Sequence, residues 1–184
     1  MSVAEEILRI YAAGGAGSYF GERVTMLEHA LQSAHFARLE GASDALVLAA
    51  LLHDIGHLLD APPEAISDWR RDARHEQSGA RWLAEHFDAA VSEPVRLHVA
   101  AKRYLCATEE SYFARLSPAS VHTLQLQGGP MSVAEVTQFE RERFAQEAVR
   151  VRRWDDDGKV AGLETAALAD YVPLINRVAR TGSA

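Results

Sequence analysis

Hydrophobic residues recur at intervals of three and four along almost the whole chain, and stretches that alternate with a period of two are hard to find. The first spacing places apolar side chains on one face of an α-helix, whereas the second is typical of a half-buried β-strand. The pattern therefore predicts an all-α fold, a helical bundle that forms a single domain over residues 1–184.

Start and end signals divide the first half of the chain into helices. The expected helices cover residues 3–12, 24–40, 43–59 and 74–87, with Ser43 as the N-cap of the third. The loop Gly14-Gly15-Ala16-Gly17 ends the first helix and Gly41 ends the second. The third contains the most apolar run of the chain, residues 45–52, so we expect it to be the central buried helix. Pro62 and Pro63 open a loop after it.

The second half of the chain is also divided by capping signals and turns. Ser92, followed by Glu93 and Pro94, predicts a helix start, with that helix running through Lys102, and Ser117–Pro118 repeats the signal. After a shaped turn at 127–130, which we place outside the site, Ser132 and Glu135 form a capping box. This box predicts a long charged helix towards residue 151, broken by a turn at 155–158. A last helix covers about 165–179, where Pro173 kinks it or delays its start.

Composition and charge narrow the classes of function. The net charge of -7 disfavours a nucleic-acid partner, and no apolar run is long enough for a membrane span. With Cys106 as the only cysteine, neither a disulfide framework nor a thiolate metal site is available. The acidic start, with Glu5 and Glu6, is unlike an export signal, so we expect a cytoplasmic protein.

The strongest local signal is the run His53-Asp54-Ile55-Gly56-His57 at the end of the most apolar helix. Burying three ionisable groups is costly unless they bind a partner such as a metal ion. The carboxylate of Asp54 has two oxygens and can bridge two metals, and Gly56 leaves room for another part of the chain to approach closely. This run therefore predicts a metal site.

One His-Asp pair cannot fill a coordination sphere, so further ligands are expected on neighbouring helices. His29 lies on the preceding helix, His75 begins the following one, His98 lies on the next, and Asp155 completes the set. Four histidines and two carboxylates without sulfur suit iron, manganese or zinc. Any one of these histidines alone would more often be an ordinary core or surface residue, so the prediction depends on their joint pattern. Asp155 stands in an acidic triplet, which is usually solvated.

This order of histidines and aspartates resembles the HD superfamily, whose members share a helical bundle around one or two metals. The matching stretches extend beyond the ligands and cover nearly the whole chain: 19–22, 27–32, 48–57, 98–105, 127–131 and 152–155. They resemble the HD-domain 2-amino-1-hydroxyethylphosphonate dioxygenases and, more distantly, myo-inositol oxygenase. The match at Arg-Arg-Trp-Asp selects Asp155 from the acidic triplet.

The resemblance implies a mixed-valence pair of iron ions, Fe(II)/Fe(III), with O2 as co-substrate. One iron is assigned to His29, His53 and Asp155 and the other to His75 and His98, with Asp54 bridging. The implied substrate-binding residues are Tyr19, Glu22, His57, Lys102, Ser120 and Arg152. Among the residues already named, the implied catalytic residues are Asp54, His57 and Lys102.

The implied reaction breaks the carbon–phosphorus bond of a small organophosphonate to give phosphate and a carboxylate, glycine or a relative such as glycine betaine. The amine end of the substrate stays open, because Glu22 can pair with either an ammonium or a trimethylammonium group. Two other classes fit the same ligands. One is an HD phosphohydrolase whose metals activate water, and the other is a binding module that senses a small anion.

Overall fold

A computed structural model describes residues 1–60 and 74–180 of the chain. In chain order the helices are α1 (Val3–Gly14), α2 (Met26–Leu39), α3 (Asp44–Leu52), α4 (Ile55–Asp60), α5 (His75–His86), α6 (Ala89–Thr108), α7 (Tyr112–Arg115), α8 (Pro118–Leu126), α9 (Val133–Phe139), α10 (Ala145–Asp157), the 3-10 helix η2 (Leu168–Tyr171) and α11 (Val172–Val178). These described residues contain no β-strand, only an isolated bridge between Ser18 and Thr25. The all-α prediction is confirmed, while the loop expected at Pro62 and Pro63 lies outside the described residues.

Side-chain caps explain where several helices begin. Ser2 and Thr25 each accept a hydrogen bond from the backbone three residues on, and the glutamate at that position bonds back to the cap. Ser132 and Glu135 form the same reciprocal pair before α9. Ser43 accepts from the backbone of Leu46 and so caps α3, as expected. These bonds satisfy backbone donors that the first turn of a helix leaves free.

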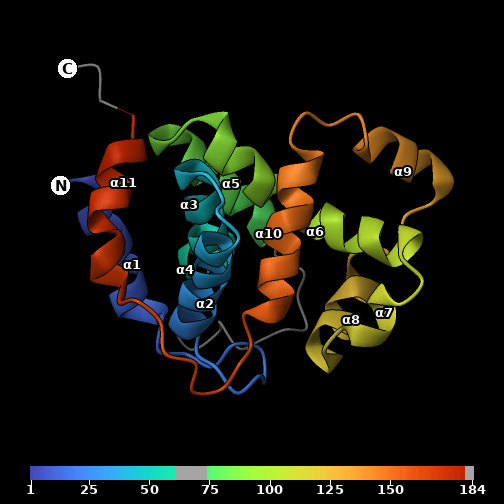
Figure 1. The fold of residues 1–184 in the computed structure, drawn as a ribbon, viewed down its shortest axis with the longest axis horizontal. Coiled ribbons are helices and arrows are strands. Elements are labelled where there is room, and N and C mark those ends of the chain that lie inside the picture. The colour runs from blue at the N-terminus through green and yellow to red at the C-terminus, as the bar shows by residue number, and fades with distance from the viewer. Residues whose placement is uncertain (61–73, 181–184) are drawn as a thin grey trace.

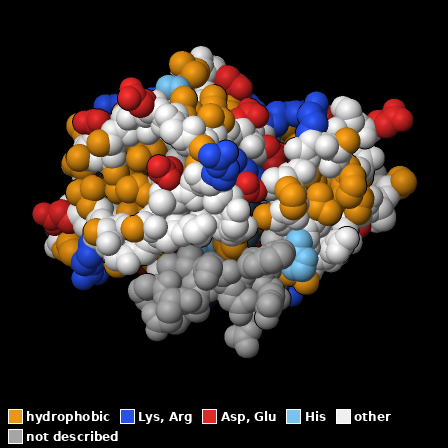
Figure 2. Space-filling model, turned by 90° about the horizontal axis from the view of Figure 1, so that it is seen from below, with side chains coloured by type: hydrophobic (Ala, Val, Ile, Leu, Met, Phe, Trp, Pro, Cys, Tyr) orange, Lys and Arg blue, Asp and Glu red, His pale blue; other side chains and the backbone are white. Residues whose placement is uncertain are grey.

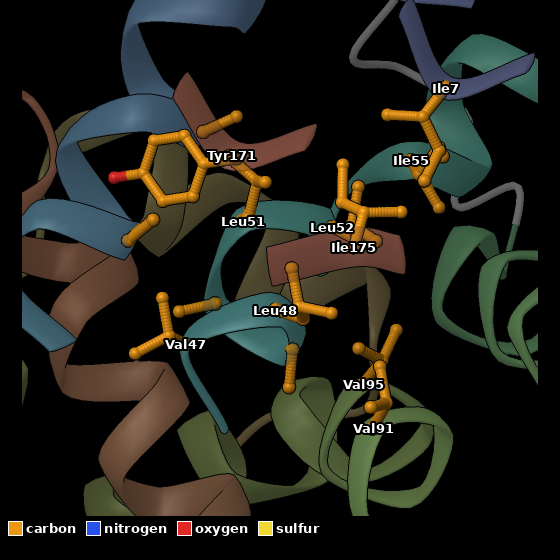
Figure 3. Close-up of a cluster of buried hydrophobic side chains, with 14 of the residues drawn as sticks. Ile7, Val47, Leu48, Leu51, Leu52, Ile55, Val91, Val95, Tyr171 and Ile175 are labelled. Atoms are coloured by element: carbon orange, nitrogen blue, oxygen red, sulfur yellow. The ribbon is translucent and has the colours of Figure 1, made fainter. Parts of the chain in front are cut away.

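The central buried helix is α3. Every residue from Leu46 to Leu52 is buried, and α3 packs against α2, α6 and α11. Figure 3 shows Leu48, Leu51 and Leu52 of α3 among side chains from α1, α6 and α11. Burying each leucine contributes about 1.5–3 kcal/mol, so this helix anchors the bundle and fixes the position of the residues that follow it.

The helices lie in successive layers (Figure 1). α1 and α11 pack together at one side, next to α2, α3 and α4, and both termini lie at that side. α6 and α10 pack against each other, and each also contacts α3. The short helices α7, α8 and α9 lie on the far side. The predicted ligands are therefore carried by the inner layers.

The third helix was expected to run unbroken to residue 59, but it ends at Leu52, and α4 begins at Ile55. The ring of His53 donates from Nδ1 to the carbonyl oxygen of Ala50, 2.8 Å away. In a continuous helix that oxygen would accept the backbone N–H of Asp54. A side chain that competes for this bond favours a break, which occurs at the two residues of the His-Asp pair.

The expected long helix from Ser132 is also wrong, because α9 ends at Phe139 and α10 begins at Ala145. Phe139 is buried against the ring of Tyr104 on α6, with centroids 4.8 Å apart. This tertiary packing turns the chain where the local pattern would continue the helix. α10 then runs to Asp157, so Asp155 lies in a helical turn rather than in the loop expected at 155–158.

Three other boundaries differ from expectation. α6 begins at Ala89 with Asp88 as its N-cap, rather than at Ser92, and includes Pro94 before ending at Thr108. The last helix begins later than expected, as η2 and then α11, with Pro173 in the first turn of α11. This matches a proline that delays a helix start. The four-residue helix α7 was not expected, since its pattern is too short to recognise.

One face of the surface is shown in Figure 2, where acidic and basic side chains are interspersed and hydrophobic groups are scattered. None of the helices in the described part of the chain combines the length and hydrophobicity that a membrane span requires.

Candidate metal centre and substrate cavity

The six predicted ligands come from separate parts of the bundle and are all buried. Their side chains are those of His29 on α2, His53 and Asp54 between α3 and α4, His75 at the start of α5, His98 on α6 and Asp155 on α10. Buried charged groups are costly without partners. The structure brings all six together around the carboxylate of Asp54.

The two oxygens of Asp54 face two different pairs of histidines. Oδ2 lies 3.6 Å from Nε2 of His29 and 3.3 Å from Nε2 of His53. Oδ1 lies 3.2 Å from Nε2 of His75 and 3.6 Å from Nε2 of His98. Each pair of histidines, together with Asp54, can hold a metal ion. The carboxylate therefore lies between two candidate sites.

Asp155 belongs to the first of these clusters. Its Oδ1 lies 3.5 Å from Nε2 of His29, and its Oδ2 lies 3.9 Å from Nε2 of His53. Neighbouring ligands of a cation bound at about 2.1 Å are themselves roughly 3 Å apart in octahedral geometry. The separations within both clusters are close to that value, and a bound cation would draw the longer ones together.

The orientation of the rings supports a cation at both places. His29, His53 and His98 place Nδ1 at 2.7–2.8 Å from the carbonyl oxygens of Gly158, Ala50 and Val95. A carbonyl only accepts, so each Nδ1 carries hydrogen, and in the neutral ring the lone pair is on Nε2.

The Nε2 atoms of His29 and His53 are only 3.1 Å apart, and those of His75 and His98 only 3.2 Å apart. In the neutral rings of His29 and His53 both of these atoms carry a lone pair, and two lone pairs at this distance repel unless a proton or a metal ion lies between them. The backbone carbonyls that accept from Nδ1 thus hold the rings of His29, His53 and His98 with Nε2 towards the cluster, as in metal sites. The residues fit two metal ions.

The electrostatics of the cluster agree with this fit. Burial, together with neighbouring His53, lowers the pKa of His29 to about 3. Burial also disfavours charge on His53, but the Asp54 carboxylate outweighs it and raises the pKa of His53 to about 9. Burial acts to raise the pKa of Asp155, but Arg152 and then Lys159 hold it well below its usual range. The site therefore favours anionic carboxylates beside the histidines.

A cavity that is partly open to solvent adjoins the cluster. Its walls include ligands from both candidate sites and a set of polar residues from the loop before α2, from α4, α6 and α8, and from α10 and the turn after it. These polar residues include Tyr19, Glu22, His57, Lys102, Ser120, Thr123, Gln127, Arg152 and Lys159. All six predicted substrate-binding residues line this cavity.

Cationic side chains gather on one wall. The ammonium of Lys102 is buried and donates to Oγ1 of Thr123 at 2.9 Å. Burial, with the Arg152 guanidinium next, lowers the pKa of Lys102 to about 7. Oγ of Ser120 accepts from Nη2 of Arg152 at 3.4 Å and from Nζ of Lys159 at 3.3 Å. Because both its lone pairs are engaged, the Ser120 hydroxyl has its own hydrogen to donate to a bound anion.

The loop before α2 covers the cluster. The hydroxyl of Tyr19 donates to Oδ2 of Asp54 at 2.9 Å, and its ring stacks on His29 with centroids 3.8 Å apart. Glu22 lines the same cavity, and its Oε1 is buried without a hydrogen-bond partner. An unpaired acceptor in a cavity wall is favourable for a ligand that brings a donor or a positive charge.

His57 lies in the first turn of α4 and lines the cavity. Its ring stacks on His75 with centroids 3.7 Å apart, and its Nε2 lies 4.0 Å from Oδ1 of Asp54. Burial, with His75 next, lowers the pKa of His57 well below its usual range. A neutral imidazole at this place can exchange a hydrogen bond or a proton with a molecule in the cavity.

Some cavity residues were missed by the sequence analysis. Lys159 follows three aspartates in a turn, a pattern that usually indicates a solvated charge, yet its Nζ lies 3.5 Å from Oδ1 of Asp155. It and Lys102 are the only two lysines among the nineteen basic residues of the chain. Gln127 was placed outside the site but lines the cavity with a buried, unpartnered Oε1. Only its membership of a matched stretch pointed to it.

Comparison with known proteins agrees with the site. A family model described as the HD domain matches residues 26–120. The chain is 42% identical over 177 residues to a [1-hydroxy-2-(trimethylamino)ethyl]phosphonate dioxygenase (glycine-betaine-forming) of Leisingera caerulea, covering 96% of this chain and 90% of the relative. It is 49% identical over 155 residues to a hydroxymethylphosphonate dioxygenase of Gimesia maris, covering 84% of this chain and 77% of the relative.

The chain therefore belongs to the HD-domain family and, within it, to the phosphonate dioxygenases. The family model ends at residue 120, before Arg152 and Asp155. The first relative matches almost the full length, so the similarity extends past both residues.

Proposed function

We propose that this protein is a di-iron oxygenase that uses O2 to break the carbon–phosphorus bond of a 1-hydroxy-2-aminoethylphosphonate-type substrate, giving a carboxylate and inorganic phosphate. The observation that carries the proposal is the position of Asp54, whose two oxygens face two histidine clusters at the edge of a cavity with a cationic wall. The two relatives act, by their names, on 1-hydroxyphosphonates, which supports the same substrate class here.

In this proposal His29, His53 and Asp155 would hold one iron, His75 and His98 would hold the other, and Asp54 would be shared by the two. A mixed-valence iron pair supplies electron transfer to O2 and a Lewis acid for the hydroxyl and phosphonate oxygens of the substrate. The remaining work of binding, orientation and proton handling belongs to the side chains of the cavity.

The reaction balances without an external reductant. A 1-hydroxyphosphonate dianion, RCH(OH)PO3²⁻, and O2 give RCOO⁻, HPO4²⁻ and a proton. Both oxygen atoms of O2 end in the products, and the electrons come from the C1–H and carbon–phosphorus bonds of the substrate. The protein must therefore hold the phosphonate, present C1 to the metals and accept the hydroxyl proton.

The cationic wall is suited to hold the phosphonate. Lys102 and Ser120 come from α6 and α8, and Arg152 comes from α10, so the anion is contacted from three helices. Charge-assisted hydrogen bonds to phosphonate oxygens are stronger than neutral ones, and more so in a buried site. This wall fixes the phosphorus end and thereby sets the position of C1.

His57 is the proposed proton acceptor. It is neutral because burial lowers its pKa, and it lines the cavity beside the Asp54 oxygen that faces the second cluster. A neutral imidazole at this place could accept the proton of the C1 hydroxyl. Catalytic roles are thus proposed for His57, Lys102 and the bridging Asp54.

Glu22 is the proposed contact for the amine end of the substrate. Its Oε1 is buried in the cavity wall and has no partner, so a positive head group would satisfy it. The two relatives differ at this end, since one is named for a trimethylamino group and the other for hydroxymethylphosphonate, which has no amine. A head group with N–H donors makes the best use of a lone carboxylate acceptor.

The test is to reconstitute the protein with Fe(II) without air, admit O2, and measure O2 uptake and phosphate together. The substrates are 2-amino-1-hydroxyethylphosphonate, its trimethylammonium analogue and hydroxymethylphosphonate. One O2 consumed per phosphate is expected. Phosphate release without O2 uptake would indicate a hydrolase, and binding without turnover would indicate a sensing module.

Variants and spectroscopy sharpen this test. His98→Ala should remove activity and one metal, whereas His35→Ala, outside the cluster, should keep both. Electron paramagnetic resonance of the partly reduced iron protein should show a coupled pair whose signal shifts when substrate is added. A protein that binds no transition metal, or whose signal ignores every substrate, would refute the proposal.

A further inference from the structure

The guanidinium of Arg152 is almost fully engaged by other side chains. Nη1 donates to Oδ2 of Asp155, and Nη2 donates to Oδ1 of Asp156 and to Oγ of Ser120. Nε donates to the hydroxyl of Tyr112 at 3.0 Å and to Oδ2 of Asp156 at 3.2 Å. An arginine carries one N–H on Nε and two on each Nη. Among the described contacts, a single Nη1–H is left for the cavity.

This count limits what Arg152 can do for a bound anion. A bidentate clamp on two phosphonate oxygens needs two parallel N–H groups on one edge of the guanidinium. Asp156 occupies the edge formed by Nε and Nη2. On the other edge, Nη1 already donates one N–H to Asp155, and Nη2 donates one to Ser120. Arg152 therefore offers the anion one hydrogen bond. Its other N–H groups are given to Asp156 and Tyr112, to the predicted metal ligand Asp155 and to the predicted anion donor Ser120.

Two residues outside the predicted site hold this guanidinium. Tyr112 is buried at the start of α7, and its hydroxyl also contacts Oδ2 of Asp156. Burial raises the pKa of Tyr112 well above its usual range, so the phenol keeps its proton and donates it to Asp156 while accepting from Nε. Asp156 is mostly buried, with a side chain 20% exposed. It is the second aspartate of the triplet that sequence patterns would assign to solvent.

We propose that Tyr112 and Asp156 are positioning residues, which hold Arg152 in the one orientation that aligns Asp155 with the first metal cluster and Ser120 with the anion. The three side chains form a clamp, with Tyr112 from α7 and the other two from α10. Because Ser120 lies on α8, the clamp also fixes the distance between the metal ligand on α10 and the anion donor on α8. Neither Tyr112 nor Asp156 lines the substrate cavity, so they act through Arg152.

The first test measures the clamp itself and does not depend on the proposed reaction. The Nε–H of Arg152 gives one proton–nitrogen correlation in a nuclear magnetic resonance spectrum, assigned by its loss in Arg152→Lys. In the intact clamp this hydrogen should exchange slowly with water. Tyr112→Phe and Asp156→Asn should each speed the exchange at least about tenfold, since a buried bond is lost.

Matched controls exist for both variants. Tyr104→Phe removes a hydroxyl that donates to Glu140 at 3.1 Å, away from the cavity. Asp157→Asn makes the same charge change one residue further along. Neither should alter the Nε–H exchange of Arg152. If Tyr112→Phe behaves like Tyr104→Phe, the hydroxyl does not hold Arg152 and the proposal is overturned.

The second test asks whether the clamp matters for the reaction, and it rests on the proposed function. Tyr112→Phe should lower kcat/KM about tenfold in the wild-type background and less than about twofold in Arg152→Lys, because coupled residues are not additive. Asp156→Glu should restore part of the activity lost in Asp156→Asn. Equal losses in both backgrounds would show that Tyr112 acts independently of Arg152 and would overturn the positioning role.

The two tests separate the proposals. Altered Nε–H exchange in a protein that shows no O2-dependent turnover would leave the clamp in place and refute the proposed function. Unchanged exchange in an active oxygenase would refute the clamp alone.

Discussion

Gly56 allows the start of α5 to approach the His-Asp pair closely. Replacing Gly56 by alanine tests whether the metal cluster of Asp54, His75 and His98 depends on that close contact. A β-carbon at Gly56 would lie 2.0 Å from the backbone oxygen and 2.8 Å from the carbonyl carbon of His75. Ordinary contacts between heavy atoms are roughly 3.5 Å, so α5 must retreat by more than about 1 Å. His75 moves with it, away from Asp54.

The expected loss follows from these distances. Nε2 of His75 is 3.2 Å from Oδ1 of Asp54, so a retreat of about 1 Å takes the ring out of reach of a cation shared with Asp54, since such bonds are about 2.1 Å long. Metal affinity at this cluster should fall about 10–100-fold. Overpacking costs about 1–3 kcal/mol, partly offset by about 1 kcal/mol of better helix propensity. In the metal-free protein the melting temperature should therefore fall by only a few degrees, and any larger fall in the metal-loaded protein reports the lost ion.

The assay is metal stoichiometry by elemental analysis, with thermal unfolding measured beside it. Gly56→Ala should retain about one metal per chain instead of two. Gly79→Ala is the control from the opposite side of the same contact, because its β-carbon would meet Gly56 no closer than 3.2 Å. It should keep both metals. A Gly56→Ala protein with two tightly bound metals would show that the close approach does not position His75.

Three further predictions concern charge and metal. Because burial, with Arg152 next, lowers the pKa of Lys102 to about 7, its ammonium form is lost as the pH rises through that value. KM should therefore rise between about pH 6 and 8 in the wild type relative to Lys102→Arg, whose charge persists; parallel profiles would contradict this. Glu22→Gln should raise the KM for 2-amino-1-hydroxyethylphosphonate about tenfold and leave the KM for hydroxymethylphosphonate nearly unchanged, since only the former brings a positive charge to the carboxylate. Equal changes in the two KM values would exclude the head-group contact. Chelation of the metals should lower the melting temperature by roughly 5–10 °C per ion, because an ion at a hundred times its Kd stabilises the folded protein by about 2.7 kcal/mol. Differential scanning calorimetry with and without a chelator measures this shift. An unchanged melting temperature would show that bound metal does not stabilise the fold.

The sequence predicts the parts of the fold that depend on local chemistry. Ser43, Ser132 and Gly41 act where their capping patterns indicate, and the apolar run at 45–52 falls in the central helix. The break between α9 and α10 could not be predicted, because it depends on Phe139 packing against α6, a contact between residues far apart in the chain. Local patterns carry no information about such partners.

The site shows the same division. The sequence spacing assigned the predicted metal ligands to successive helices, and the structure brings their side chains together. These ligands are His29, His53, Asp54, His75 and His98. Lys159 and Asp156 were missed because three aspartates followed by a glycine and a lysine resemble a solvated turn. The continuation of α10 through Asp157 turns both residues inward, towards Ser120 and Arg152 respectively.

The lysine content of the chain offers a practical route to its chemistry. Lys102 and Lys159 are the only side-chain amines, and both line the cavity. Apart from the amino terminus, an amine-selective reagent can therefore modify this protein only at the cavity wall. Selective carbon-13 labelling of lysine would give a nuclear magnetic resonance spectrum with signals from these two residues alone. Because both side chains line the cavity, a shift of either signal on adding a ligand would report binding there.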